Sequence, residues 1–361
     1  MRAILSVSCA VCLLLAVVVI ALVEKSAFTP HENTLQDGDA TLVMPTFTSD
    51  VYLCTAYAAQ VCAGDVTTEK AYKSGDPHCA FSFPYQLTDT SGVLRISENS
   101  DMTDCLEFVM DKKETAVTVD NLKTGTTYYY KATVGDQEFV GSFHTASTTR
   151  FLTIPSLRNV RDIGGYQTES GRTVKQAMLI RGPEIDGLIN PDYFIPVDKI
   201  AAVQETFGFA HELDLRAPTT YTGTYQSRFG SDVSHRFYNS PSYGGIFNPE
   251  NSGIIRSIFS DLANPNLYPM YMHCTWGADR TGTIAFLVLG MLGVSEDDMI
   301  LDYNLSDFAV SGFSQRENLE PLIWGLNVYE GDTLQEKIVS YLMSVGVTES
   351  EIASIRSILL T

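Results

Sequence analysis

A cysteine, a glycine and an arginine lie close together in residues 273–282 (HCTWGADRTG), with the arginine six positions after the cysteine. Residues 267–272 before this stretch are apolar and aromatic, which predicts a short buried strand, and residues 283–292 after it predict a buried helix. A tight loop between a strand and a helix N-terminus points N–H groups inward, at the positive end of the helix dipole. The stretch therefore predicts a binding site for a dianion.

The side chains of this loop add a nucleophile and a cation to the anion site. Cys274, at the mouth of the loop, would be a thiolate near neutral pH. Arg280 can bind two oxygens of one anion with its planar guanidinium, and Thr281 can donate its hydroxyl to the sulfur. This set suits attack on a phosphate monoester, with the arginine holding the equatorial oxygens through the transition state. The other loop residues expected to contact the substrate are Thr275, Trp276, Gly277 and Ala278.

The same stretch resembles the signature loop of the protein tyrosine phosphatase superfamily, which reads His-Cys, five residues, Arg, then Ser or Thr. Residue types, spacing and the strand–loop–helix context all agree with that loop. The resemblance implies a phosphocysteine intermediate and a reaction that needs neither a metal nor another cofactor. The simpler alternative is a buried cysteine that precedes an arginine by chance.

Asp279 is the predicted general acid, because the departing alkoxide or phenoxide needs a proton. The chain has no Trp-Pro-Asp tripeptide, the motif that carries this acid in many members of the superfamily. Asp279 instead resembles the in-loop aspartate of myotubularins and of bacterial and fungal tyrosine and lipid phosphatases, whose loop reads His-Cys-x-x-Gly-Lys-Asp-Arg-Thr-Gly. The alternative is that Asp279 only balances the charge of Arg280. Ala278 replaces the usual lysine of that family, which disfavours highly charged inositol headgroups.

Residues 156–166 (SLRNVRDIGGY) resemble the Asn-x-Arg-Asp-x-Gly-Gly segment that opens the catalytic domain in the same family. On this resemblance Arg161 is expected to face the substrate anion and Asp162 to hold it in place. The alternative is a surface ion pair between the two, which would contribute little to stability.

Two further predicted strands, 176–182 and 209–216, end in residues that match the family, an arginine and an Asp-Leu-Arg sequence. Because the carboxyl ends of parallel strands line the site, Asp214 and Arg216 are expected near Cys274. We assign Arg216 to anion binding and Asp214 to loop support, with Asp214 as the second choice for the acid. The residues expected to support the site are His273, Asp162, Asp214 and Arg181.

The resemblance continues to the C-terminus. Residues 293–306 are similar to a family segment containing Asp-Tyr, and Ser295 there is a predicted helix N-cap. The sequences that begin at Thr333 and Thr348 predict capping boxes for two further helices. We therefore expect residues 151–361 to form a tyrosine-phosphatase-like α/β domain with a mostly parallel central sheet flanked by helices.

An all-β domain is predicted before it. Residues 39–148 contain about seven short strand-like runs separated by turn signals, and Gly135-Asp136 suits a hairpin turn. Residues 122–131 (LKTGTTYYYK) resemble the corner before the penultimate strand of fibronectin type III domains. The sequence thus predicts a multi-domain chain in which a fibronectin type III-like sandwich precedes the catalytic domain. Such a sandwich would serve as a spacer or contact a surface, a carbohydrate or a protein.

The N-terminal end predicts export. Residues 1–23 are apolar apart from Arg2 and a few small polar residues, as expected of a signal peptide or a membrane anchor, and residues 24–38 predict a linker. Localisation outside the cytoplasm, secreted or anchored to the membrane, follows. Four cysteines of the first domain would then be able to form two disulfides in any of three pairings, unless they are free thiols: Cys54, Cys62, Cys79 and Cys105.

The charge of the chain limits its partners. Its 24 Lys and Arg against 43 Asp and Glu give a net charge of −19, which excludes nucleic acid as a partner and disfavours anionic membranes. We therefore expect an exported cysteine-dependent phosphatase, with phosphotyrosine-type substrates or other small phosphomonoesters favoured. The alternatives are a phosphoinositide or phytate phosphatase with the same mechanism, or a non-catalytic protein that binds phosphorylated ligands. The sequence leaves the oligomeric state open.

Overall fold

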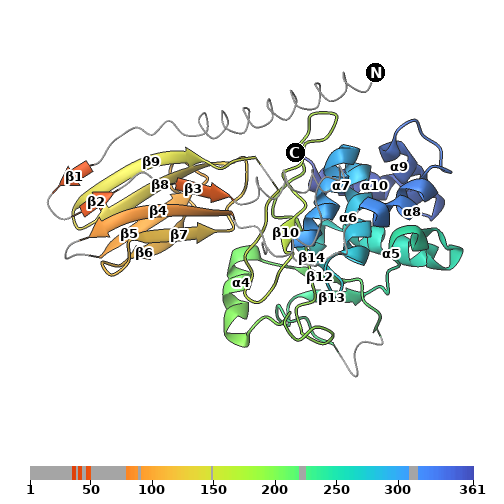
Figure 1. Cartoon of the computed structure of the whole chain (residues 1–361), viewed down its shortest axis with the longest axis horizontal. Coiled ribbons are helices and arrows are strands. Elements are labelled where there is room, and N and C mark those ends of the chain that lie inside the picture. Colours follow the sequence, from red (N-terminus) through yellow and green to blue (C-terminus); the bar gives the residue numbers. More distant parts are fainter. Residues whose placement is uncertain are drawn as a thin grey trace, which may run out of the picture. The chain divides into compact units, whose positions relative to one another are not determined.

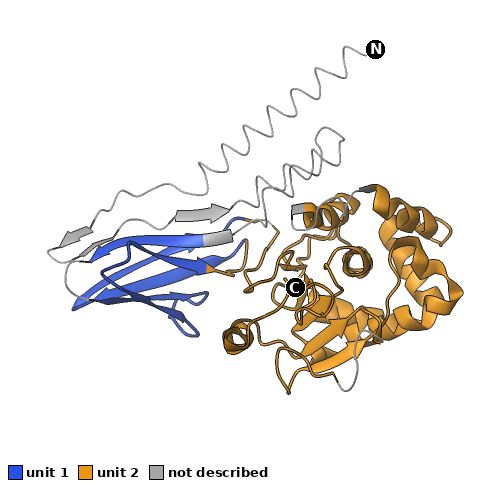
Figure 2. Cartoon of the chain, turned by 60° about the horizontal axis from the view of Figure 1, so that its bottom comes forward, with its two compact units in different colours: residues 1–47, 81–119, 125–146 blue, residues 48–80, 120–124, 147–361 orange. Residues whose placement is uncertain are grey.

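The structure, a computed structural model, describes residues 35–37, 40–42, 46–49, 79–87, 91–147, 149–218, 225–308 and 316–361. The chain divides into two compact units (Figure 2). The first contains residues 1–47, 81–119 and 125–146, and the second contains residues 48–80, 120–124 and 147–361. The predicted leader and most of the predicted linker lie outside the described residues. None of the helices in the described part of the chain has the length and apolarity needed to span a bilayer.

The first unit is built from two β-sheets (Figure 1). One has the strand order β1-β2-β4-β3 with β7 on β4, and the other has the order β6-β5-β8-β9. The strands are β1 (Leu35–Asp37), β2 (Ala40–Leu42), β3 (Thr46–Ser49), β4 (Cys79–Leu87), β5 (Gly92–Ser97), β6 (Leu106–Met110), β7 (Ala116–Asp120), β8 (Thr127–Val134) and β9 (Gln137–His144). The predicted hairpin is confirmed, because Val134 pairs with Gln137 across Gly135 and Asp136.

Alternating side chains of these strands form the core of the first unit. Phe81 of β4 stacks on Phe143 of β9 with ring centroids 3.8 Å apart, and Phe83 meets Tyr130 of β8 edge to face at 5.2 Å. All four rings are buried, so aromatic packing joins strands from the two sheets. The fibronectin type III identity of the unit stays a prediction. Cys105 is a free thiol, so two disulfides among the four cysteines are not formed as predicted.

The second unit contains a mixed α/β fold around one mostly parallel sheet, as predicted. Its strand order is β10-β11-β14-β12-β13, and the β10–β11 pair alone is antiparallel among the pairs of this described sheet. The strands are β10 (Arg161–Asp162), β11 (Leu179–Gly182), β12 (His211–Asp214), β13 (Ser234–Phe237) and β14 (Met270–His273). The register sets His273, at the end of β14, beside Gly182 and Asp214 of its two neighbours.

Side chains alternate between the two faces of this sheet. Met270 and Met272 of β14 belong to one apolar cluster, whereas Tyr271 between them belongs to another. The first cluster includes side chains of the C-terminal helices, and the second includes Val203 of α4. The α-helices are α4 (Ile200–Phe207), α5 (Ser252–Leu262), α6 (Asp279–Leu292), α7 (Glu296–Asn304), α8 (Arg316–Leu326), α9 (Leu334–Ser344) and α10 (Glu349–Leu359). Short 3-10 helices are η1 (Val197–Lys199), η3 (Tyr243–Phe247), η4 (Pro249–Asn251), η5 (Pro265–Leu267) and η6 (Leu305–Phe308).

The predicted helix starts are confirmed. Ser295 caps α7 by accepting a hydrogen bond from the N–H of Asp298, and Thr333 and Thr348 each form a complete capping box. The helix α6 begins at Asp279, four residues earlier than its apolar stretch predicts. Its side chains from Thr281 to Leu292 are all buried, so it is a core helix whose first turn lies in the predicted anion loop.

Candidate active site

The loop between β14 and α6 is fixed by close backbone packing at Gly277. This residue has a φ of +70°, which favours glycine. A Cβ atom there would lie 2.5 Å from the carbonyl carbon and oxygen of Gly182, at the end of the neighbouring strand β11. The loop can therefore follow this path only with glycine at position 277.

The carbonyl groups of the loop are all hydrogen-bonded, the first three by other parts of the second unit and the last two by α6 itself. Each of five successive carbonyl oxygens accepts a hydrogen bond: Thr275 from the Glu184 N–H at 3.2 Å, Trp276 from Asn159 Nδ2 at 3.1 Å, Gly277 from Arg181 Nη2 at 2.8 Å, Ala278 from the Gly282 N–H at 2.7 Å and Asp279 from Thr283 Oγ1 at 2.8 Å. Because a trans peptide unit points its N–H away from its carbonyl, these contacts turn the N–H groups of the loop to its other side.

The N–H groups of this loop have no acceptor among the described residues. Within the described part of the chain, none of the backbone N–H groups of residues 275–281 donates a hydrogen bond to another residue. They include the first N–H groups of a 14-residue helix, where the dipole is positive. Buried donors of this kind are normally paired, so the geometry is that of an anion-binding loop.

Cys274 begins this loop and is more deeply placed than predicted. Its side chain is 2% exposed and belongs to the apolar cluster around α6, so it lies inside the unit and not at the mouth of the loop. Arg280 returns across the loop as predicted, because its Nη2 donates to Thr275 Oγ1 at 3.2 Å and its Nη1 donates to the Leu215 carbonyl at 3.3 Å. Both Arg280 and Asp279 are partly exposed, and Trp276 is 39% exposed.

The predicted hydrogen bond from Thr281 to the sulfur is not formed. The Thr281 hydroxyl is buried and has no hydrogen-bond partner among the described residues. An unpaired buried hydroxyl costs about 1–3 kcal/mol, so this group is a free donor inside the site.

Arg161 does not face the loop, which corrects its predicted role in substrate binding. It is fully buried, and its guanidinium donates to Asp302 at 3.0 Å, to Asn159 and to Ser306 at 3.0 Å. These acceptors occupy its Nε, Nη1 and Nη2 groups, so the side chain has a structural role. Arg161 fixes Asn159, whose amide in turn holds the Trp276 carbonyl.

Arg181 supports the loop as predicted. One end of its guanidinium pairs with Asp302, and the other donates to the Gly277 carbonyl. Burial, and then the nearby charge of Arg161, lowers the pKa of Arg181 to about 10, so it stays protonated at neutral pH. Arg161 and Arg181 share the carboxylate of Asp302, which leaves one positive charge behind the loop.

Asp162 holds the chain near Gly164 instead of holding Arg161. Its carboxylate accepts hydrogen bonds from the Gly164 N–H at 2.8 Å, the Ala177 N–H at 2.6 Å and Arg150 Nη1 at 2.8 Å. The side chain is fully buried, so the alternative of a surface ion pair with Arg161 is wrong as well.

Arg216 is also buried and paired, which corrects its predicted role in anion binding. Its guanidinium contacts three carboxylates, those of Glu184 at 2.5 Å, Asp186 at 2.8 Å and Asp214 at 2.7 Å. Burial alone would raise the pKa of Asp214, but His273, His235 and Arg216 outweigh it and hold that pKa well below its usual range. Asp214 therefore stays ionised and is not a proton donor at neutral pH.

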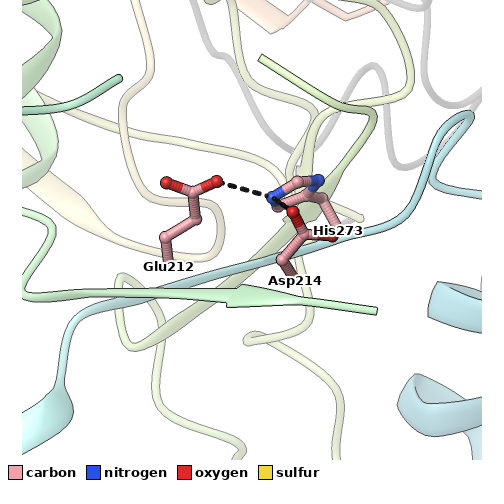
Figure 3. A group of neighbouring side chains, drawn as sticks. All are labelled: Glu212, Asp214 and His273. Carbon is pink, nitrogen blue, oxygen red and sulfur yellow. Dashed lines mark hydrogen bonds and ion pairs between the residues drawn. The ribbon is translucent and has the colours of Figure 1, made fainter. Parts of the chain in front are cut away.

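His273 connects the loop to the carboxylates of Glu212 and Asp214 (Figure 3). Its Nδ1 lies 3.2 Å from the Cys274 carbonyl oxygen and its Nε2 lies 2.9 Å from Glu212 Oε1, with Asp214 Oδ2 at 3.7 Å. Both ring nitrogens thus face acceptors. Burial alone would lower the pKa of His273, but Asp214 and Glu212 outweigh it and raise the pKa above 6.5. The ring is therefore an imidazolium next to Cys274 over a wider pH range than an ordinary histidine.

Glu212, Asp214 and His273 also offer three ligand atoms within 4.8 Å of one another (Figure 3). Their residue types are those of metal ligands. However, Glu212 Oε1 also accepts a hydrogen bond from the Tyr225 hydroxyl at 2.7 Å, and Asp214 Oδ2 accepts from Arg216. Donors and a guanidinium already fill the positions that a cation would take, so the group fits an ion-pair network better than a metal centre.

The predicted acid, Asp279, lies in the first turn of α6 next to Arg280. Its Oδ1 accepts a hydrogen bond from the hydroxyl of Tyr243, which belongs to η3. The alternative assignment, in which Asp279 only balances Arg280, does not account for this tyrosine.

Sequence reasoning missed three residues that shape the loop: Asn159, Glu184 and Asp302. It named Tyr243 only as an aromatic residue of the pocket rim that could stack on the substrate, and not as a partner of Asp279. Asn159 and Asp302 lie within the two segments whose resemblance to the family was used to predict other residues. A role in the site for the asparagine of Asn-x-Arg-Asp and for the aspartate of Asp-Tyr could therefore have been predicted from the same resemblance. Glu184 lies three residues after Arg181, and no local pattern identifies it.

Comparison with known proteins agrees with this geometry. Residues 152–323, which include the loop, match the profile of the tyrosine phosphatase family. The chain is also similar to a protein named "Putative tyrosine-protein phosphatase" from Cupriavidus necator, with 25% identity over 189 residues, 45% of this chain and 66% of that protein. The chain thus spans just under two thirds of that relative's length. Both similarities are to proteins described as tyrosine phosphatases.

Proposed function

We propose that this chain is a cysteine-dependent phosphatase that hydrolyses phosphate monoesters through a phosphocysteine intermediate, with phosphotyrosine-type substrates favoured. The observation that carries the proposal is the orientation of the loop from Cys274 to Arg280. The carbonyl groups of Thr275, Trp276 and Gly277 are bound from outside the loop, its N–H groups are left for a ligand, and Arg280 returns across it. A tetrahedral dianion matches such a ring of donors closed by a guanidinium.

The chemistry follows from this set of groups. The thiolate of Cys274 attacks phosphorus, the bond from phosphorus to the ester oxygen breaks, and Asp279 gives its proton to that oxygen. The ionised Asp279 then takes a proton from water as the water attacks the phosphocysteine, which releases phosphate and restores the thiolate. Arg280 and the loop N–H groups hold the three equatorial oxygens in both steps.

Two buried cations lie near Cys274. The imidazolium of His273 contacts the Cys274 carbonyl oxygen, and the guanidinium of Arg181 binds the Gly277 carbonyl of the same loop. Arg181 shares its carboxylate partner, Asp302, with Arg161, which leaves one positive charge behind the loop. This charge favours the binding of an anionic substrate by an acidic chain.

The choice of phosphotyrosine over more highly charged substrates is supported by the residues around the loop. Ala278 brings no cation to the site and is fully buried. Trp276 is partly exposed on the loop and meets Tyr193 edge to face at 5.6 Å, so an aromatic surface lies beside the anion site. Such a surface suits an aryl leaving group better than an inositol ring with several phosphates.

Export is part of the proposal. The apolar residues 1–23 support it, since a run of this kind at an N-terminus is typical of a signal peptide or anchor. The substrates would then be phosphorylated proteins or small phosphomonoesters outside the cytoplasm.

The test is hydrolysis of a phosphotyrosine peptide by the full chain, its Cys274→Ser variant and its Cys105→Ser variant. Cys105 is the other free thiol of the described residues and serves as the matched control. We expect Cys274→Ser to abolish phosphate release and the control to retain it, with no effect of a chelator. Rapid acid quenching should trap phosphate on Cys274. Turnover by Cys274→Ser would overturn the mechanism, whereas binding without turnover by the native chain would favour a phospholigand-binding protein.

The same assay decides the substrate class. Phosphotyrosine peptide, phosphatidylinositol phosphates and phytate are compared by kcat/KM with the native chain. A preference of at least tenfold for the peptide is expected from the residues at positions 276 and 278. A preference for the inositol substrates would show instead that a cation elsewhere replaces the missing lysine.

A further inference from the structure

Tyr243 is hydrogen-bonded to the predicted acid and to a second tyrosine. Its hydroxyl donates to Asp279 Oδ1 and also bonds the hydroxyl of Tyr303, the penultimate residue of α7. Tyr243 has one hydroxyl proton, so when it donates to the Asp279 carboxylate the proton between the two tyrosines must come from Tyr303. The three side chains thus form one chain of hydrogen bonds that ends on the carboxylate.

The backbone at Tyr243 is held in an unusual conformation by the same part of α6. Its φ is +51°, a region that a bulky side chain enters at a cost of about 1–3 kcal/mol. The Tyr243 N–H donates to Thr283 Oγ1 at 2.9 Å, and that hydroxyl donates to the Asp279 carbonyl at 2.8 Å. Main chain and side chain of Tyr243 therefore both bind the first turn of α6.

The rest of η3 is packed firmly enough to sustain this conformation. The Ile246 carbonyl accepts a hydrogen bond from the Tyr341 hydroxyl of α9 at 2.9 Å, and Ile246 is fully buried. A Cβ atom on Gly244 would lie 3.2 Å from Pro321 of α8. Strain retained in a well-packed segment next to a reactive group points to a functional constraint on where Tyr243 aims its hydroxyl.

We propose that Tyr243 is the positioning residue of the general acid Asp279, and that it determines which oxygen of that carboxyl group carries the transferable proton. The proposal rests on the phosphatase function above. Because Tyr243 donates to Oδ1, the proton of the neutral acid sits on Oδ2. That oxygen is the one left to face the leaving group.

The charges around Tyr243 agree with its role as a donor. Burial, and then the neighbouring Tyr303 and Asp279, raises the pKa of Tyr243 well above 10. Burial likewise raises the pKa of Tyr303. Both hydroxyls therefore keep their protons throughout the pH range of the reaction and remain hydrogen-bond donors.

The experiment compares Tyr243→Phe with Asp279→Asn and with the double variant, using two substrates that differ in leaving group. A tyrosine leaving group, with a pKa of about 10, needs the acid, whereas p-nitrophenyl phosphate has a better leaving group and needs it less. The matched control is Tyr238→Phe, because Tyr238 donates to Asp261 in another tyrosine–aspartate pair of the same unit. Retained secondary structure is checked by circular dichroism.

We expect Tyr243→Phe to lower kcat on the phosphotyrosine peptide roughly 10- to 100-fold, with KM nearly unchanged and a much smaller loss on p-nitrophenyl phosphate. The double variant should be no slower than Asp279→Asn alone, since Tyr243 acts through Asp279. Equal losses on both substrates, additive losses in the double variant, or full activity of Tyr243→Phe would overturn the proposal. A native chain inactive on both substrates would instead overturn the phosphatase function itself.

Discussion

Arg181 donates a hydrogen bond from Nη2 to the carbonyl oxygen of Gly277 at 2.8 Å, while its Nη1 pairs with Asp302 on the other side. The anion loop is thus shaped from behind, by a buried cation that the substrate does not touch. Asp302 also pairs with Arg161, which fixes Asn159 and through it the Trp276 carbonyl. One carboxylate of α7 therefore determines the orientation of two successive peptide groups of the loop.

Replacement of Arg181 by methionine tests this support. It leaves the Gly277 carbonyl unpaired and Asp302 with one guanidinium instead of two, so we expect the loop to lose its orientation. A loss of roughly 3–5 kcal/mol in the free energy of unfolding is typical for removing one partner of a buried ion pair. We also expect kcat/KM to fall at least tenfold. Urea denaturation and phosphotyrosine hydrolysis measure the two effects.

The matched control is Arg172→Met, because Arg172 donates to the carbonyl groups of Leu360 and Thr361 and not to the loop. It should change stability little and activity not at all. Arg181→Lys should recover part of the stability, since it restores the charge without the planar pair of donors. Native activity in Arg181→Met would show that the loop holds its shape without Arg181.

Local signals in the sequence were sufficient to predict the frame of the site. Short apolar and aromatic runs between turn signals predicted the strands, and residues 267–292 predicted a strand, a loop and a helix. The N-cap at Ser295 and the two capping boxes were predicted because each depends on residues three positions apart. Interactions within a few residues of one another are encoded locally, so the sequence reveals them directly.

The roles of the buried arginines could not be predicted in the same way. Arg181 lies near the end of β11 and Arg216 lies two residues after β12, as the sequence indicated, whereas Arg161 is the first residue of β10. Which of them faces the substrate depends on where their acceptors lie. Asp302 is 141 residues from Arg161 in sequence, and Glu184 is 32 residues from Arg216. These carboxylates reach the guanidinium groups only in the folded unit, so the spacing of residues in the sequence could not predict the pairs.

Gly277→Ala is expected to abolish activity because it distorts the backbone of the loop, although it removes no functional group. Its Cβ would meet the Gly182 carbonyl at 2.5 Å, in addition to the cost of a positive φ. The matched control is Gly208→Ala, because Gly208 has a φ of +60° at the end of α4 but open space around its Cβ position. The control should show the conformational cost alone, about 1 kcal/mol. Thermal denaturation and hydrolysis should therefore show a larger loss of stability and of activity for Gly277→Ala than for Gly208→Ala. Equal losses in the two variants would contradict a steric requirement at position 277.

His211 should destabilise the fold in acid. Burial lowers its pKa from 6.5 to about 4, against the opposing effect of Asp261. The unfolded chain then binds a proton below pH 6.5 that the folded chain does not bind, so stability present above pH 6.5 is lost as the pH falls toward 4. The loss is on the order of 3 kcal/mol. Urea midpoints between pH 7 and pH 4.5 should fall less steeply for His211→Asn than for the native chain.

His273 should contribute stability that is lost as the pH rises above neutrality. Its pKa is raised, so the folded chain holds a proton that the unfolded chain releases at about pH 6.5. The stability that this proton contributes is complete below pH 6.5 and is lost as the pH rises through the raised pKa. The groups that face the ring are Glu212, Asp214 and Arg216, and the two carboxylates outweigh the arginine. Urea midpoints between pH 6 and pH 8.5 should therefore decline in the native chain and stay nearly level in His273→Gln. A decline of the same size in both proteins would mean that another group releases the proton, and the imidazolium beside Cys274 would then lose its support.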